Sequence, residues 1–124
     1  MRFQPTEPAS TFAVPGATFT TLSSPSRGAR ENAVWLVRMA PGRPGAPHRV
    51  SREETFVALS GRAQASIDGQ VHELAAGSAL VVPAGALLSM ANPGPDMFEA
   101  IAVMPVGATV SIDAQAPFVP PWAA

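Results

Sequence analysis

The chemistry open to this 124-residue chain rests on two histidines and nine carboxylates. His48 and Glu54 stand six residues apart, and an imidazole near a carboxylate can transfer protons or ligate a divalent metal ion. The absence of cysteine excludes a thiolate zinc site, a disulfide framework and a cysteine nucleophile. The absence of lysine excludes Schiff-base chemistry and a P-loop lysine. Any metal site must therefore use carboxylates, at most two imidazoles, amides and water.

The charge and hydropathy of the chain exclude several classes of partner. Eight arginines and nine carboxylates give a net charge of −1 at pH 7, and the arginines form no basic run. Nucleic-acid binding requires a basic face, so we expect no nucleic-acid partner. No apolar run approaches the ~20 residues of a membrane span, and the first residues lack the apolar core of a signal peptide. We therefore expect a cytoplasmic protein with no membrane partner.

The spacing of proline and glycine predicts the elements that must position His48 and Glu54. These residues interrupt the chain every eight to twelve positions, with no useful helical period between them, which is typical of an all-β sandwich or barrel. Asp68-Gly69 predicts a two-residue hairpin turn. The predicted strands are 18–22, 33–39, 54–60, 62–68, 70–74, 79–82, 86–91 and 97–104, with a further short strand within 106–112.

Two stretches of the chain carry a recognisable spacing. The first has the form G-x5-H-x-V-x3-E-x6-G and the second G-x5-P-x-G-x2-L-x3-N, with fifteen residues between them. Their defining residues are Gly42, His48, Val50, Glu54 and Gly61, then Gly77, Pro83, Gly85, Leu88 and Asn92. This pattern resembles the paired signature of the cupin superfamily, and eight of its ten defining positions match. The chain is similar to the small single-domain cupins.

The resemblance implies a single-domain double-stranded β-helix, a jelly-roll β-barrel with two antiparallel sheets and a pocket between them. We expect an extended N-terminal arm over 1–17, the barrel over 18–112 and an extended C-terminal tail over 113–124 that packs on the outside. Exposed sheet edges need cover, and the two apolar arms could provide it by crossing to a partner. Many similar cupins are dimers, so a homodimer is the expected state.

The departures from the family pattern concern the metal site. The resemblance implies four metal ligands, but Val50 and Leu88 occupy two of their positions, which leaves His48 and Glu54 as ligands if a metal is bound. We therefore expect either no cofactor or a weakly held divalent ion such as Zn, Fe, Mn or Ni. A buried Glu54 would have a raised pKa unless His48, Arg49 or Arg52 pairs with it.

The predicted pocket is more apolar than in metal-binding relatives. Its expected lining, besides His48 and Glu54, is Val50, Phe56, Leu88, Met90, Met39, Phe98 and Met104, with Trp35 and Met97 as further candidates. Alternation places Phe98 and Met104 on one face of their strand and Met97 on the other, without fixing which face is inner. We expect His72 at the surface, Arg38 on an outer face and Asn92 in a turn.

Three hypotheses of function follow from the sequence. The first is a protein that binds a small, largely apolar organic molecule, with His48 and Glu54 as polar anchors and a degenerate metal site. The second is an isomerase, cyclase, decarboxylase or dioxygenase type of cupin enzyme, in which Glu54 and His48 act by acid–base or metal-assisted chemistry. The third is a sensing module that acts through a partner protein.

Overall fold

The computed structural model describes residues 3, 5 and 10–124. The strands there are β1 (Thr11–Val14), β2 (Ala17–Ser23), β3 (Asn32–Met39), β4 (His48–Val50), β5 (Glu54–Ser60), β6 (Arg62–Ile67), β7 (Gln70–Ala75), β8 (Ala79–Val82), β9 (Leu87–Ala91), β10 (Phe98–Pro105) and β11 (Val110–Ser111). Two 3-10 turns, η1 (Pro25–Arg27) and η2 (Pro121–Ala123), complete the fold. Within these residues no helix has the length and apolar character to cross a membrane.

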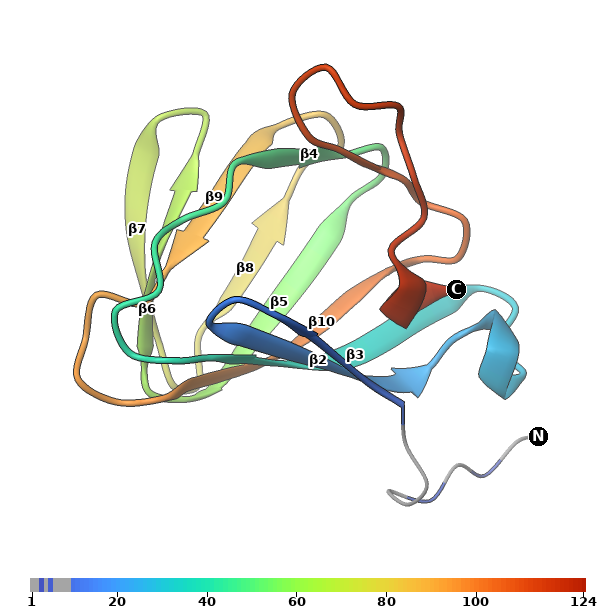
Figure 1. Cartoon of the computed structure of the whole chain (residues 1–124), viewed down its shortest axis with the longest axis horizontal. Coiled ribbons are helices and arrows are strands. Elements are labelled where there is room, and N and C mark those ends of the chain that lie inside the picture. Colours follow the sequence, from blue (N-terminus) through green and yellow to red (C-terminus); the bar gives the residue numbers. More distant parts are fainter. Residues whose placement is uncertain (1–2, 4, 6–9) are drawn as a thin grey trace.

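The strands form the two antiparallel sheets that the sequence predicts. One sheet has the order β1-β2-β3-β10-β5-β8 and the other the order β11-β4-β9-β6-β7. In Figure 1, β4 and β9 lie at the top of the view, with β2 and β3 below them in the opposite sheet. The all-β, single-domain architecture is confirmed, and side chains from both sheets meet between them.

The predicted strand positions are confirmed closely over the central part of the chain. Strands β5 and β8 begin and end at the predicted residues, β7 ends one residue later than predicted, and β10 is shifted by one residue at both ends. The hairpin is also confirmed: Ile67 pairs with Gln70, and Asp68 and Gly69 have φ angles of 49° and 85°. Positive φ at both central residues is what a type I′ turn requires.

Three segments differ from the expectations drawn from sequence. The segment expected as an arm contains β1, which folds back on β2 through Pro15-Gly16 because Gly16 adopts a φ of +75°. The three-residue strand β4 follows the proline-rich loop and pairs with β9 and β11. The tail ends in η2 against β2 and β3 rather than remaining extended. Strand β1 and the turn η2 therefore pack within the same chain.

The core lies between the two sheets, and β10 shows which strand faces point into it. Phe98, Ala100, Ala102 and Met104 are buried, whereas the alternate residues of β10 are partly exposed. On the opposite face Arg38 of β3 forms an ion pair with Glu99 at 3.5 Å, which confirms the outer position expected for Arg38. The structure thus settles the inner face that the sequence left open.

Candidate functional site

A cavity of about 320 Å³ lies between the two sheets. Both residues of the predicted polar pair line it, and so do most of the predicted apolar residues: His48, Glu54, Met39, Phe56, Leu88, Met90 and Met104, together with Trp35. They come from β3, β4, β5, β9 and β10, so the cavity brings together residues that the sequence separates by up to 69 positions, from Trp35 to Met104.

Three residues considered as pocket residues lie elsewhere. Phe98 is fully buried but does not line the cavity, because it packs in the solid part of the core where β10 begins. Val50 is also a core residue outside the lining, paired with Val110 of β11. Met97 is 46% exposed and precedes β10, on the outside of the barrel. His72 is exposed on β7, as expected.

Glu54 is a buried carboxyl without a partner in the described part of the chain. It is the first residue of β5, pairs in register with Val82, and is only 4% exposed. Its Oε1 atom is buried and forms no hydrogen bond with any described residue. Removal from water raises the pKa of Glu54 to about 8, because burial penalises the charged form. Glu54 is therefore mainly a neutral acid at pH 7.

His48 and the nearby arginines do not pair with Glu54. His48 Nδ1 hydrogen-bonds at 2.9 Å to the carbonyl oxygen of Ala46, and since a carbonyl only accepts, Nδ1 is the donor. The neutral imidazole then keeps a lone pair on Nε2. Arg49 is exposed and donates to the Gly85 carbonyl at 2.7 Å, and Arg52 is exposed. The partners expected for the carboxyl are thus engaged elsewhere or outside the cavity.

Arg43 is a cavity residue that sequence reasoning missed. It lies in the loop between β3 and β4, and its guanidinium contacts Met39 Sδ at 3.5 Å and the Pro15 carbonyl at 3.3 Å. Burial lowers its pKa from the ordinary value, because desolvation penalises the cation. A position next to Gly42, in the first family motif, was the available signal. The proline-rich loop gave no indication of which way this side chain points.

The C-terminal segment supplies an aromatic wall, contrary to the expectation that it packs on the outside. Trp122 lines the cavity and stacks on Phe19 of β2, with ring centroids 4.0 Å apart and planes 12° apart. Thr21 Oγ1 donates a hydrogen bond of 2.8 Å to the Trp122 carbonyl and fixes this position. Figure 1 shows the red C-terminal segment descending to η2 near β2 and β3. An isolated tryptophan among prolines was the only signal in the sequence.

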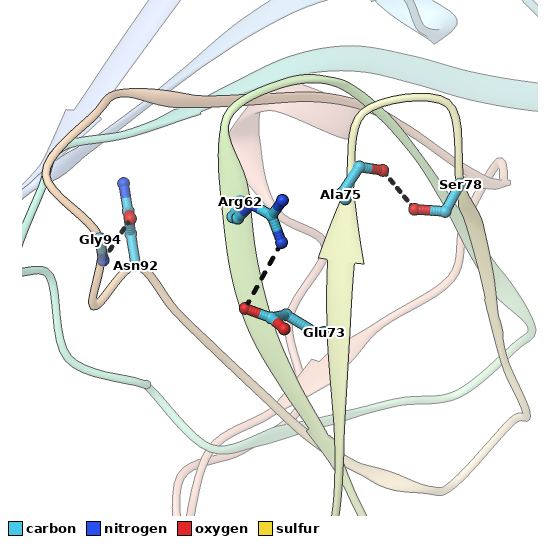
Figure 2. A network of polar contacts seen from close by, with 6 residues as sticks. All are labelled: Arg62, Glu73, Ala75, Ser78, Asn92 and Gly94. Atoms are coloured by element: carbon cyan, nitrogen blue, oxygen red, sulfur yellow. Dashed lines mark hydrogen bonds and ion pairs between the residues drawn. The ribbon is translucent and has the colours of Figure 1, made fainter.

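Asn92 closes the second motif and fixes the ends of the neighbouring loops. Its buried side-chain amide donates to the Met39 carbonyl at 2.9 Å and the Asp96 carbonyl at 2.8 Å. Its Oδ1 atom accepts a hydrogen bond from the Gly94 backbone at 3.2 Å, shown in Figure 2. The turn role predicted for Asn92 is confirmed. The same residue also holds the end of β3, beside the cavity.

The donor atoms at the cavity do not match a site with three or four protein ligands. Among the described residues no group of three or more His, Cys, Asp or Glu side chains lies close enough to hold a metal ion. The register explains part of this, because His48 pairs directly with Leu88, one of the two positions where the family pattern has a further histidine. One imidazole and one carboxyl remain, whereas transition-metal sites in enzymes commonly use three protein ligands.

Comparison with protein families and curated proteins gives one match. The model of the family described as "Cupin domain" matches residues 35–104, more than half of the chain. The matched region contains every strand from β3 to β10 except the first three residues of β3 and the last residue of β10. Comparison with curated proteins gives no match.

Several solved structures have the same fold. The polyketide cyclase RemF from Streptomyces resistomycificus is similar with a TM-score of 0.80 and 17% identity, over 94% of this chain and 87% of that one. An RmlC-like cupin from Shewanella frigidimarina is similar with a TM-score of 0.71 and 17% identity, over 83% of this chain and 88% of that one. Salicylate 1,2-dioxygenase from Pseudoaminobacter salicylatoxidans is similar with a TM-score of 0.72 and 16% identity, over 86% of this chain and 31% of that one. At these identities the likeness concerns the fold alone.

Proposed function

The chain belongs to the cupin family, and we propose on that basis that it binds a small, flat, largely apolar organic molecule in the cavity between its sheets. His48 and Glu54 are the polar anchors in this proposal. The observation that carries it is the cavity itself: an apolar space of about 320 Å³ with few polar groups. Such a space is the usual form of a small-molecule site, and its volume is at the lower end of the usual range of roughly 300–1,000 Å³.

The size and walls of the cavity support a ligand of about two fused rings. A cavity of about 150 Å³ can take benzene, so the present space suits a molecule roughly twice that size. Trp35, Phe56 and Trp122 give flat faces, which favour stacked or edge-to-face contact with an aromatic ligand. The thioethers of Met39, Met90 and Met104 adapt to irregular apolar shapes.

The proposal assigns no resident metal ion to the site. Leu88 and Val50 replace two imidazole positions of the family pattern with apolar side chains, which removes two donors. Metal analysis of the dialysed protein tests this directly, because one retained equivalent of Fe, Mn, Ni or Zn would contradict it.

Binding can be measured with 2-naphthalenemethanol, an uncharged bicyclic arene. The chain has two tryptophans, and both line the cavity, so saturable quenching of their fluorescence reports occupancy. In the variant Leu88→Phe the larger ring enters the cavity, and we expect the affinity to fall by about tenfold or more, equivalent to about 1.4 kcal/mol.

Leu87→Phe is the matched control for this experiment. Leu87 precedes Leu88 on β9 but points outward and is 38% exposed, so the same substitution there should leave the affinity unchanged. Thermal unfolding of both variants checks that they remain folded. Absence of saturable binding to the wild-type protein, or equal affinity in the two variants, would contradict the proposed site.

A proton-transfer enzyme is the second candidate, and the observation that favours it is a cavity lined by both the buried Glu54 carboxyl and a half-buried imidazole. A carboxyl with a pKa of about 8 can donate a proton at pH 7 and accept one above pH 8. His48, with Nδ1 held by the Ala46 carbonyl, can present Nε2 as its complement. The similar RemF structure is described as a polyketide cyclase, which agrees with an enzyme of this kind.

The enzyme proposal can be tested with 5-nitrobenzisoxazole, a flat bicyclic molecule. A carboxylate base removes its carbon-bound proton while the ring N–O bond breaks, which releases a coloured cyanophenolate. We expect a rate that rises through pH 8 and falls by about 10²–10⁴-fold in Glu54→Gln, the usual contribution of a general base. The control is Glu53→Gln, an exposed neighbour. Equal rates in both variants would remove Glu54 from the chemistry.

Three predictions from the sequence remain proposals. The homodimer is supported by exposed apolar side chains on the outer face of β5 and β8, among them Leu59 and Val81. Sedimentation equilibrium gives the mass and so decides between monomer and dimer. The cytoplasmic location rests on the lack of a long apolar run and of a signal-peptide pattern in this sequence. A sensing module would act through a partner protein, because this sequence carries no DNA-binding segment.

A further inference from the structure

The cavity contains a cation that no carboxylate of the described residues neutralises. Arg43 is the one arginine among the described residues that line it. The ion pairs found in the described part of the chain, Arg38 with Glu99 and Arg62 with Glu73, lie outside the cavity, and Figure 2 shows the second. Glu54 shares the cavity with Arg43, yet no ion pair joins them. Arg43 thus keeps its positive charge in an apolar space.

The backbone around Arg43 is fixed by the second motif. The Arg43 carbonyl accepts a hydrogen bond of 3.0 Å from the Asn92 backbone N–H, and Gly42 N–H donates to the Asn92 carbonyl at 2.7 Å. Both ends of the link belong to family motif positions, Gly42 and Asn92. The loop that carries Arg43 is therefore tied to β9 at the residue itself.

The side chain of Arg43 is positioned as well. Its methylene stem crosses Gly16, where an added Cβ atom would lie only 3.0 Å from Arg43 Cγ. Its Nε donates to the Pro15 carbonyl at 3.3 Å. The absence of a side chain at Gly16 leaves the space that the stem occupies, and the turn between β1 and β2 thereby directs the guanidinium toward the cavity.

The Arg43 guanidinium has N–H donors that could bind a ligand. A guanidinium carries five N–H groups, whereas among the described residues its acceptors are one carbonyl and the Met39 thioether, a weak acceptor. A partly buried cation with few acceptors has lost hydration without full replacement. An anionic oxygen group on a bound molecule would supply both the missing charge and the missing acceptors.

We propose that Arg43 is the specificity-determining residue of this cavity and selects flat, apolar molecules that carry an anionic oxygen group, a carboxylate above all, over their uncharged analogues. This rests on the proposed function, since it needs the cavity to be a ligand site. A carboxylate matches the planar fork of the guanidinium by accepting two parallel N–H bonds, which a hydroxyl group cannot do. The apolar body of the ligand then lies among the aromatic and methionine side chains.

The test compares 2-naphthoate with 2-naphthalenemethanol, which share a ring system and differ in the anionic group. Dissociation constants are measured by tryptophan quenching at pH 7 and fixed ionic strength. We expect the wild-type protein to prefer 2-naphthoate by about tenfold or more, the range of a charge-assisted hydrogen bond. In Arg43→Gln the preference should disappear, because the affinity for 2-naphthoate should fall much more than the affinity for the alcohol. In the control Arg38→Gln, on the outer face of β3, the preference should remain.

The outcomes separate this inference from the proposed function. Binding of both probes with no preference, or a preference that survives in Arg43→Gln, overturns the role of Arg43 and leaves the cavity as a ligand site. Binding of neither probe overturns the site itself. If Arg43→Gln does not fold, a crystal structure of the wild-type protein with 2-naphthoate decides the question. A carboxylate within hydrogen-bond distance of the Arg43 guanidinium supports the inference, and any other position overturns it.

Discussion

Glu54 occupies a place where an apolar side chain would stabilise the barrel more. The alternation of β5 turns Glu54, Phe56 and Ala58 inward, and the first of these is an acid. Burial of a carboxyl without a hydrogen-bond partner costs free energy, and the cost is least when the group is protonated. The raised pKa of about 8 expresses this cost. A residue that opposes stability in this way is a candidate for function.

The free energy of unfolding should depend on pH through Glu54. The pKa of Glu54 is raised from its ordinary value of 4.5 to about 8 in the folded protein. Between these two pH values the folded protein therefore holds one proton more than the unfolded chain. Stability therefore falls as the pH rises through this window, by about 1.4 kcal/mol per pH unit for one proton. Urea unfolding at several pH values measures this slope.

The contribution of Glu54 is isolated by comparing two glutamine variants. Glu54→Gln should remove this part of the slope and be more stable than the wild-type protein above pH 8. Glu53→Gln, at the exposed neighbouring position, should follow the wild-type profile. Parallel profiles for the wild-type protein and Glu54→Gln would show that the carboxyl reaches water in the folded state.

At the scale of elements, the terminal segments close the barrel around the cavity. Strand β1 pairs with β2 at the edge of their sheet, and η2 places Trp122 against Phe19. Phe12 of β1 also approaches Trp122, with ring centroids 6.4 Å apart. The hairpin of β1 and β2 thus meets a tryptophan from the opposite end of the chain. The last residues of the chain are therefore part of the cavity wall.

Trp122→Ala should weaken both stability and binding. The loss of the stacked pair alone should lower the free energy of unfolding by about 0.5–1.5 kcal/mol, with a further loss from exposed apolar area. The affinity for 2-naphthalenemethanol should fall, because one wall of the cavity is removed. Val119→Ala changes a 38% exposed residue of the same segment and should affect neither quantity. Unchanged binding in Trp122→Ala would place the ligand away from this wall.

The side-chain amide of Asn92 fixes the start of the loop between β3 and β4. Asn92→Ala removes the hydrogen bonds that the side-chain amide donates to the Met39 and Asp96 carbonyls. We expect the free energy of unfolding to fall by about 1–3 kcal/mol. Calorimetric titration should show a larger loss of affinity for 2-naphthoate than for the alcohol, since the loop carries Arg43. Equal losses for both probes would mean that Asn92 does not position Arg43.

At the scale of the whole molecule, the space between the sheets divides into a solid part and a hollow part. Phe98 packs in the solid part and is completely buried, whereas Met104, at the other end of β10, lines the cavity. Stability and binding therefore depend on different residues of the same strand.

Phe98→Ala should affect stability and leave binding by the folded protein unchanged. Removal of a fully buried phenylalanine costs about 3–5 kcal/mol, measured by urea unfolding at 25 °C. Met97→Ala, at the 46% exposed neighbour, should stay within about 0.5 kcal/mol of the wild-type value. A small loss in Phe98→Ala would show that the core collapses around the missing ring. Altered probe affinity would instead extend the cavity toward Phe98.

Much of the fold could be predicted because its signals are local. The limits of β5 and β8 and the turn at Asp68-Gly69 depend on neighbouring residues and on glycine and proline, which act over a few positions. The placement of His48, Glu54 and Leu88 at one cavity was also predicted, from a motif whose spacing encodes long-range pairing. The inward face of β10 was not, because both faces of that strand carry apolar residues.

The sequence by itself determined the family, the two-sheet fold and the residues of the central polar pair, since these follow from spacing along the chain. The tertiary structure decided which polar groups remain unpartnered and which distant residues complete the cavity. Glu54 Oε1 is buried without a hydrogen-bond partner among the described residues, and the stem of Arg43 occupies the space left by the missing side chain of Gly16. These are facts of three-dimensional packing between segments far apart in sequence, and no local pattern encodes them.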